Sequence, residues 1–114
     1  MTMGKFLLVS LWILCALIRA KVGAVTYVVA PCYNEELRLP RDIYRDFFKD
    51  PRNKDIRLTF VNDGSKDKTL TLISEIAQEL PNSITVYDLV TNRGKAEAVR
   101  QGMLHVIKVQ NMGL

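Results

Sequence analysis

Three short polar loops carry the residues whose types and spacing could do chemistry. They are residues 31–36, 62–67 and 92–95, and each combines a turn-forming residue with a charged one. Each loop follows a run of apolar and β-branched residues that predicts a strand. Because loops at the carboxyl ends of parallel strands converge, we expect the three loops to enclose one polar ligand.

Asp63 is the residue of the second loop that could bind a ligand directly. A carboxylate that follows a strand and precedes a glycine can accept hydrogen bonds from a base or a sugar. Asn-Asp-Gly-Ser is also a favourable turn sequence, so a purely structural role for Asp63 stays open. Two interpretations apply to Glu35 as well: an acceptor for a nucleobase or ribose, or a solvated acid at a helix start.

Lys95 and Tyr33 are further candidates for ligand contacts. Lys95 follows Gly94 at the start of an expected helix, where free N–H groups and the helix dipole attract phosphate. Lysines at helix starts are common and usually solvated, so Lys95 says little by itself. Tyr33 could stack on a base, although a tyrosine beside a core strand more often packs against it.

Other chemistries find little support in the sequence. It contains no P-loop and no Gly-x-Gly-x-x-Gly motif, which disfavours an ATP site and a Rossmann-type oxidoreductase. His105, the only histidine, has no cysteine or acid beside it. Ser65 and Cys32 lack a basic partner at a suggestive spacing, and Cys15 and Cys32 show no disulfide or metal-site spacing. We therefore interpret His105, Ser65 and Cys32 as structural residues.

Alternating strands and helices must position the loops. Strands are expected at residues 25–30, 56–61 and 84–90, and helices at residues 39–50, 67–80 and 95–109. β-Branched and aromatic residues mark the strands, and apolar residues at helical spacing mark the helices. Strands that alternate with helices of this length predict an α/β fold, in which helices cover both faces of a parallel sheet.

Residues 1–24 differ in composition from the rest of the chain. They contain an apolar run over residues 6–18, three cations and no acid, whereas residues 25–114 are close to electrically neutral. Most of the formal net charge of +4 therefore flanks an apolar segment, where cations usually face lipid headgroups. This distribution argues against a basic nucleic-acid-binding face, so we expect no nucleic-acid partner.

We favour a membrane anchor over a cleaved secretory signal for residues 1–24. The apolar run is shorter than the roughly 20 residues that cross a bilayer. Counting from Met1 and letting Lys5 and Arg19 snorkel gives a marginal span. Cleavage after Ala24 would fall at the edge of the first core strand, which disfavours a signal peptide. The small excess of cations on the C-terminal side predicts a single membrane segment with a cytosolic globular part.

Three motifs follow one another along the chain. They are VVAPCYNEE at residues 28–36, VNDGSKDKT at 61–69 and NRGKA at 92–96, with Gly102 after them. Together these motifs resemble those of the family 2 glycosyltransferases. The likeness is closest to the branch of dolichyl-phosphate glucosyltransferases and polyprenyl-phosphate sugar synthases.

The resemblance implies the GT-A fold, a Rossmann-like sheet that binds a nucleotide-sugar at the strand ends. It implies transfer of a hexose, with inversion, from a UDP- or GDP-sugar to a polyprenyl or dolichyl phosphate at a membrane. The residues that it implies for nucleotide-sugar binding are Pro31, Tyr33, Glu35, Asp63 and Lys95. Among these, Asp63 would contact the base and Lys95 would lie near the nucleotide.

Two departures from the family pattern shape this expectation. Asn62-Asp63 stands where the family has paired aspartates, and the base contact maps to the second position. The family's Asp-x-Asp, which holds Mg²⁺ or Mn²⁺ on the sugar diphosphate, and its catalytic base follow a later strand. No acid follows Glu97 here. We therefore expect residues 25–114 to be an N-terminal nucleotide-binding half that lacks the metal ligands and is inactive alone. The alternative is a non-catalytic nucleotide-binding or interaction module.

Overall fold

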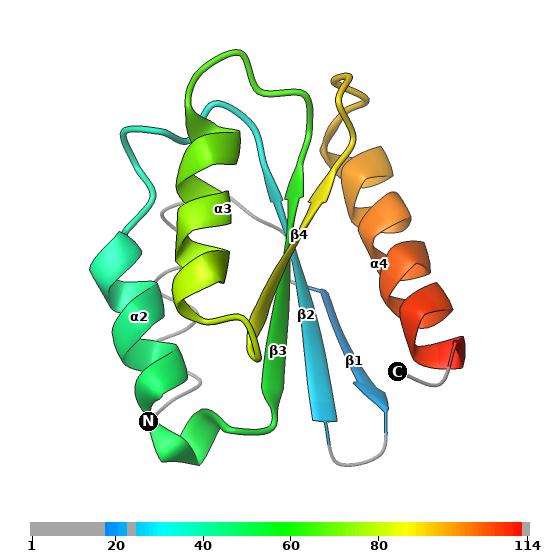
Figure 1. Ribbon diagram of the computed structural model, residues 1–114. Helices are drawn as coiled ribbons and strands as arrows, with labels where there is room; N and C mark the ends of the chain where they lie inside the picture. The colour runs from blue at the N-terminus through cyan, green and yellow to red at the C-terminus, as the bar shows by residue number, and fades with distance from the viewer. Residues whose placement is uncertain (1–17, 23–24, 113–114) are drawn as a thin grey trace.

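A single four-stranded sheet organises the computed structural model, which describes residues 18–22 and 25–112 (Figure 1). Its elements are β1 (Ile18–Val22), β2 (Val25–Cys32), α2 (Arg41–Lys49), the 3-10 helix η1 (Pro51–Asn53), β3 (Ile56–Asn62), α3 (Thr69–Glu79), β4 (Ile84–Asp88) and α4 (Lys95–Asn111). The strand order is β1-β2-β3-β4, with β2, β3 and β4 parallel to one another and β1 antiparallel to β2. The predicted α/β fold with a parallel sheet is confirmed.

Helices cover both faces of the sheet, as the sequence predicts (Figure 1). The larger core lies between the sheet, α2 and α3, where Tyr44 and Phe60 meet edge to face with ring centroids 5.1 Å apart. The smaller core lies under α4 and contains Val29, Val61 and Ala98. Burial of these apolar side chains on both faces fixes the register of the sheet, and hence which strand ends come together.

Gly102 allows α4 to pack closely on the sheet. A Cβ atom at this position would lie 2.6 Å from Val29 Cγ1 and 2.6 Å from Val61 Cγ2. Any larger residue would push the helix away from β2 and β3 or force these valines to move. The glycine thus sets the distance of α4 from the sheet.

Two strand ends differ from the sequence prediction. β2 continues through Pro31 and Cys32, which lie beyond Val29, where the pairing with β1 ends. Pro31 has no N–H to donate. It therefore suits a position where β2 pairs with β3 on one side and has no strand on the other. β4 ends at Asp88 instead of residue 90, because the backbone of Val90 turns to a φ of 69°.

Ile18–Val22 form a strand and are not part of a helical anchor, which corrects the prediction for residues 18–22. Two residues separate β1 from β2 in the sequence, and such a short connection favours antiparallel pairing. The edge of β2 also offers backbone hydrogen-bonding groups that need partners. The rest of the predicted anchor, residues 1–17, lies outside the described residues. Within the described part of the chain, no helix is both long enough and apolar enough to cross a membrane.

Candidate functional site

The loops after β2, β3 and β4 meet at one end of the sheet (Figure 1). We refer to residues 33–40, 63–68 and 89–94 as the first, second and third loops. A cavity of about 360 Å³ lies between them, lined by Pro31, Cys32, Tyr33, Glu35, Asp63, Asn92, Gly94 and Lys95. The structure therefore brings all the predicted nucleotide-binding residues to one cavity, and their role in binding stays a prediction.

Asn34 joins the first loop to the second. Its backbone N–H donates to Ser65 Oγ at 3.0 Å, and its side-chain Oδ1 accepts from the N–H of Lys66 at 2.8 Å. Asn34 has a φ of 52°, a left-handed conformation that asparagine tolerates better than most residues. These reciprocal bonds make the first two loops one braced unit.

Two acids extend the same brace to the start of α3. The Glu36 N–H donates to Asp67 Oδ2 at 3.2 Å, and the Lys68 N–H donates to Glu36 Oε1 at 3.0 Å. Asp67 Oδ1 accepts from the N–H of Thr69, the first residue of α3, at 2.9 Å, although the N-cap position itself is Lys68. Burial raises the pKa of Asp67, but hydrogen bonds from Thr69 and Glu36 outweigh it and leave that pKa below its ordinary value.

Glu35 is buried, with only 4% of its surface exposed. Its N–H donates to Thr69 Oγ1 at 2.7 Å, and its Oε1 accepts from Arg38 Nη2. Its Oε2 is buried and has no hydrogen-bond partner among the described residues. Burial raises the pKa of Glu35 by more than Arg38 lowers it. Because Glu35 also lines the cavity, a ligand that donates to Oε2 would satisfy this acceptor. The alternative of a solvated acid at a helix start is wrong.

Asp63 holds the third loop against the second. It is 2% exposed, and its Oδ1 accepts from the Arg93 N–H at 2.7 Å. Its Oδ2 accepts from the Gly94 N–H at 3.1 Å and from Asn92 Nδ2 at 3.3 Å. These bonds use three of the roughly four acceptor positions of a carboxylate. The structural role left open for Asp63 is thus present, and the predicted contact with a base would add to it.

Gly64 places the second and third loops in direct backbone contact. It has a φ of +66°, and a Cβ atom there would lie 2.2 Å from the backbone nitrogen of Asn92. The Asn92 side chain also donates to the Asp63 carbonyl oxygen at 3.0 Å. From the sequence, Asn92 is expected only as part of the turn near the nucleotide, and Thr69 has no assigned role. The sequence signals for Asn92 are its place in the loop after the third strand and in the NRGKA motif, and neither predicts its bonds to Asp63.

Lys95 begins α4 at the edge of the cavity, directly after Gly94. Gly94 has a φ of 94° and its carbonyl oxygen accepts from the Ala98 N–H at 2.9 Å, which closes the first turn. The first N–H groups of a helix have no intrahelical partners and attract anions. The first loop thus supplies an acidic and aromatic side of the cavity, and the start of α4 supplies a cationic side.

The residues interpreted as structural have packing or hydrogen-bonding partners. His105 stacks on Tyr87 with ring centroids 4.2 Å apart. Ser65 accepts from the first loop, and Cys32 is 1% exposed with its thiol directed at the Ala30 carbonyl oxygen, 3.7 Å away. The described residues contain no group of three or more His, Cys, Asp or Glu side chains that could hold a metal ion. They therefore do not fit a metal centre of their own.

A second cavity, of about 390 Å³, lies between α4 and the sheet, toward the amino ends of the parallel strands. The Thr59 and Thr85 hydroxyls, which line it, hydrogen-bond to each other at 3.0 Å. None of the predicted binding residues reaches this cavity. The cavity between the loops is therefore the better candidate for a ligand site.

Comparison with known proteins gives one family. The family model described as Glycosyl transferase family 2 matches residues 27–107. Among curated proteins, the dolichyl-phosphate beta-glucosyltransferase ALG5A of Trichomonas vaginalis is 42% identical over 85 residues, covering 69% of this chain and 26% of that protein. The human dolichyl-phosphate beta-glucosyltransferase is 37% identical over 83 residues, covering 67% of this chain and 26% of that protein.

A bacterial relative and a solved structure extend this comparison. The undecaprenyl-phosphate 4-deoxy-4-formamido-L-arabinose transferase of Enterobacter sp. is 35% identical over 80 residues, covering 69% of this chain and 24% of that protein. A mannosyltransferase of Pyrobaculum calidifontis, solved with GDP-Man and Mn²⁺, matches with a TM-score of 0.54 and 24% identity. That match covers 91% of this chain and 32% of the other. The chain spans about a quarter of the length of the curated relatives.

Proposed function

The chain belongs to glycosyl transferase family 2, and from this premise we propose that its loop cavity binds the nucleoside diphosphate of a nucleotide-sugar. One observation carries the proposal: Glu35 Oε2 is a buried acceptor without a partner in the described chain, and it adjoins the cavity that Lys95 also lines. An unpaired buried acceptor at one side and a cationic helix start at the other suit a ligand with hydrogen-bond donors at one end and phosphates at the other.

Each predicted residue has a distinct part in this binding. Tyr33 is 40% exposed at the cavity and, with Pro31, offers an apolar surface on which a base can stack. Glu35 accepts from a base N–H or a ribose hydroxyl, and Asp63 keeps the loops in place while it accepts from the base. Lys95 and the first turn of α4 bind the diphosphate, where an ammonium group and backbone N–H groups are both donors.

We propose that the whole enzyme transfers a hexose, with inversion, from a UDP- or GDP-sugar to a polyprenyl or dolichyl phosphate. The acceptor oxygen attacks the anomeric carbon while the nucleoside diphosphate leaves. Family 2 chemistry calls for Mg²⁺ or Mn²⁺ on that leaving group, and the described residues contain no cluster of ligands that fits such an ion. Because the chain matches about a quarter of its relatives, we assign donor binding to residues 25–114 and transfer to the whole enzyme.

The names of the relatives support the class of acceptor. Three of them are named as transferases that act with dolichyl phosphate or undecaprenyl phosphate. A lipid acceptor implies a membrane, and we keep the proposal of a membrane anchor for residues 1–17, with a cytosolic globular part. The alternative of a non-catalytic interaction module draws no support from these names.

Calorimetric titration of the chain with UDP and with GDP tests donor binding. We expect one of them to bind and Glu35→Gln to weaken it about 10- to 100-fold, because a hydrogen bond to a charged group contributes about 1.5–3 kcal/mol. Glu75→Gln removes an exposed acid on α3, away from the cavity, and is the matched control. If neither nucleotide binds, or if Glu35→Gln and Lys95→Ala both leave the affinity unchanged, the cavity assignment is wrong.

A further inference from the structure

Two exposed apolar side chains stand at the loop end of the molecule. Leu37 in the first loop is 95% exposed and Val90 in the third loop is 77% exposed, the highest values among the large hydrophobic residues between positions 25 and 112. Neither side chain lines the loop cavity. Their exposure therefore serves neither the core nor the proposed nucleotide contacts.

The backbone at Val90 makes this exposure more unusual. Val90 has a φ of 69°, and the Thr91 N–H donates to the Leu89 carbonyl oxygen at 2.7 Å, which closes a tight γ-turn around it. A β-branched residue rarely adopts a positive φ, and a glycine or asparagine would adopt it with less strain. The fold thus holds a strained valine in solvent where a polar turn residue would fit better.

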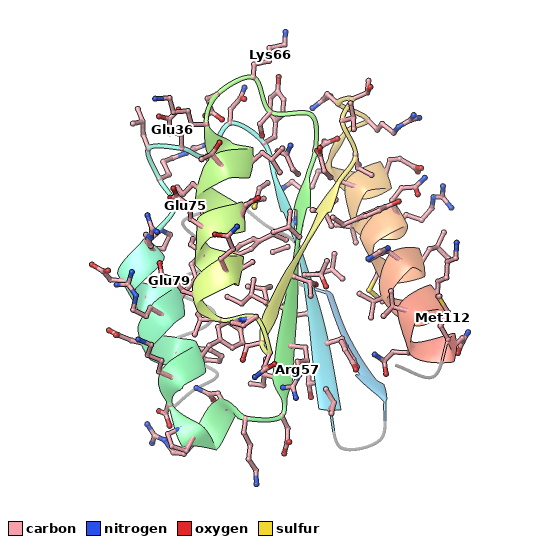
Figure 2. All side chains as sticks on the ribbon, in the orientation of Figure 1. Glu36, Arg57, Lys66, Glu75, Glu79 and Met112 are labelled. Carbon is pink, nitrogen blue, oxygen red and sulfur yellow. The ribbon has the colours of Figure 1, made fainter. Side chains whose placement is uncertain are left out.

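The charged groups at the same end differ in whether they have partners within the described chain. Each carboxylate of the three loops and of the adjoining end of β4 accepts hydrogen bonds from within this region; the residues are Glu35, Glu36, Asp63, Asp67 and Asp88. The side chains of Lys66, Lys68 and Arg93 are exposed and form no ion pair within residues 25–112. Figure 2 shows Lys66 extending from the tip of the second loop, away from the rest of the molecule. These three cations are therefore exposed charged groups of this end without an ion pair in the described chain, whereas its acids, of which Asp67 and Asp88 are also exposed, accept hydrogen bonds from neighbouring groups.

The direction of β1 connects this end to the apolar segment. Ile18 pairs with Val29, whereas Val22 pairs with Val25, so the chain enters β1 on the side nearer the loops. The apolar run over residues 6–17 is joined to Ile18 by the sequence alone. If that run lies in a membrane, as proposed above, the loop end is the end of the sheet that it brings toward the bilayer.

From these observations we propose that the loop end docks on an anionic phospholipid bilayer. Leu37 and Val90 enter the headgroup region, and Lys66, Lys68 and Arg93 lie close to lipid phosphates. Exposed apolar side chains at the same end of a molecule as cations without ion pairs suit an anionic lipid interface, because the apolar groups leave water while the cations gain phosphate partners. The inference deepens the proposed function, since the donor cavity then faces the surface where a lipid acceptor is held.

A fluorescent label at three positions of the full chain tests this docking. An environment-sensitive dye is attached to Leu37→Cys, Val90→Cys or Lys54→Cys in a Cys15→Ser background. Lys54 is exposed and precedes β3 at the opposite end of the sheet, which makes it the matched control. With vesicles of phosphatidylcholine and phosphatidylserine, we expect a blue shift and quenching by lipid-borne quenchers at positions 37 and 90, and neither at position 54. Dyes at 37 and 90 that behave like the dye at 54 overturn the proposal.

The contribution of the cations is measured on the same label. Lys66→Gln and Lys68→Gln should each lower the ratio of inserted to free dye at position 37 about fivefold, because a surface cation near anionic lipid contributes about 1 kcal/mol. Lys54→Gln should leave it unchanged. Equal insertion into vesicles of phosphatidylcholine alone would show that anionic headgroups are not required, and no effect of the two substitutions would show that these lysines do not bind them; either result contradicts docking on anionic lipid.

The two proposals fail separately. None of Leu37, Lys66, Lys68 and Val90 lines the donor cavity, so UDP or GDP titration of the docking variants in solution should match the parent chain. Nucleotide binding without insertion of the dye removes the docking proposal alone. Insertion of the dye without nucleotide binding removes the donor-site proposal and leaves the membrane-facing surface.

Discussion

At Glu35, burial of the carboxylate disfavours folding, whereas the proposed ligand site needs that buried acceptor. The Glu35 side chain is buried, which raises its pKa above the ordinary value of 4.5, and one carboxylate oxygen has no partner within the described chain. A carboxyl that binds its proton more tightly when folded stabilises the protein below its unfolded pKa. That contribution is lost as the pH rises through the folded pKa.

Replacing Glu35 by glutamine should therefore change stability in a pH-dependent way. The free energy of unfolding of Glu35→Gln, minus that of the parent chain, should become more positive as the pH rises from about 4.5 through the raised pKa of Glu35. The variant thus gains stability relative to the parent chain, and the difference levels off above that pKa. Urea unfolding at a series of pH values measures this difference, with Glu75→Gln as the control for loss of a glutamate charge. A difference that is constant or that shrinks with rising pH contradicts the burial argument.

Gly64 and Gly94 allow backbone strain to be separated from a steric contact. Both have positive φ, but a Cβ at position 64 would lie 2.2 Å from the Asn92 nitrogen, whereas a Cβ at position 94 meets nothing within 4 Å. Gly94→Ala should cost about 1–3 kcal/mol from backbone strain alone. Gly64→Ala should cost clearly more and weaken UDP or GDP binding, since it separates the second and third loops. Equal losses in urea unfolding for the two variants would mean that the contact at Gly64 can relax.

The sequence predicts which residues line the site, but not their burial or their hydrogen bonds. The position of Pro31, Tyr33 and Lys95 at strand ends follows from local pattern and the rule for parallel sheets. The burial of Glu35 and the three hydrogen bonds to Asp63 depend on residues about 30 or more positions away, such as Thr69 and the third loop. Local sequence carries no signal for such pairings, which is why two interpretations of each acid stayed open.

At the element scale, salt bridges join α2 to α3 on the surface away from α4. Arg41 pairs with Glu75 and Glu79, and Arg45 pairs with Glu79 and Asp42. Hydrogen bonds from Arg45 and Arg41 lower the pKa of Glu79 from 4.5 to about 2. A carboxyl with a lowered folded pKa stabilises the protein above its unfolded pKa, and this contribution is lost as the pH falls through the folded pKa.

Glu79→Gln should therefore be less stable than the parent chain at neutral pH, and the difference should disappear between about pH 4.5 and about pH 2. The difference should also shrink at high salt, because these groups are solvent-exposed. Urea unfolding over that pH range measures it. Asp46→Asn removes an exposed acid of α2 that forms no ion pair within the described residues, and it controls for the change in net charge. A pH-independent difference would show that Glu79 acts through packing instead.

The elements themselves were largely predictable, with one exception that has a physical cause. The three parallel strands and three α-helices follow from period and punctuation, and each is found within a few residues of its expected bounds. The sequence predicts that residues 18–22 belong to the anchor, because their composition resembles a membrane flank. The pairing of β1 is decided by the unpaired edge of β2, which is a property of the assembled sheet and not of the segment.

At the scale of the whole molecule, the three loops form one structure held at few points. The first loop is bonded to the second through Asn34 and Glu36, and the second to the third through Asp63 and Gly64. A ligand that spans from the first loop to the start of α4 would connect the first and third loops directly, in addition to their bonds to the second loop. Binding should therefore stabilise the domain as a whole, beyond the side chains that it touches.

Thermal unfolding with separate parts of the ligand tests this connection. UDP or GDP at about 100 times its Kd should add about 2.7 kcal/mol and raise the Tm by roughly 10–20 °C for a domain of this size. The matching nucleoside and inorganic pyrophosphate, each occupying one side, should give smaller shifts at the same concentration. Lys95→Ala should remove most of the shift with pyrophosphate and preserve the shift with the nucleoside. If pyrophosphate alone stabilises the chain as much as UDP or GDP does, the site recognises an anion and not a nucleotide, and the part assigned to Glu35 and Tyr33 is wrong.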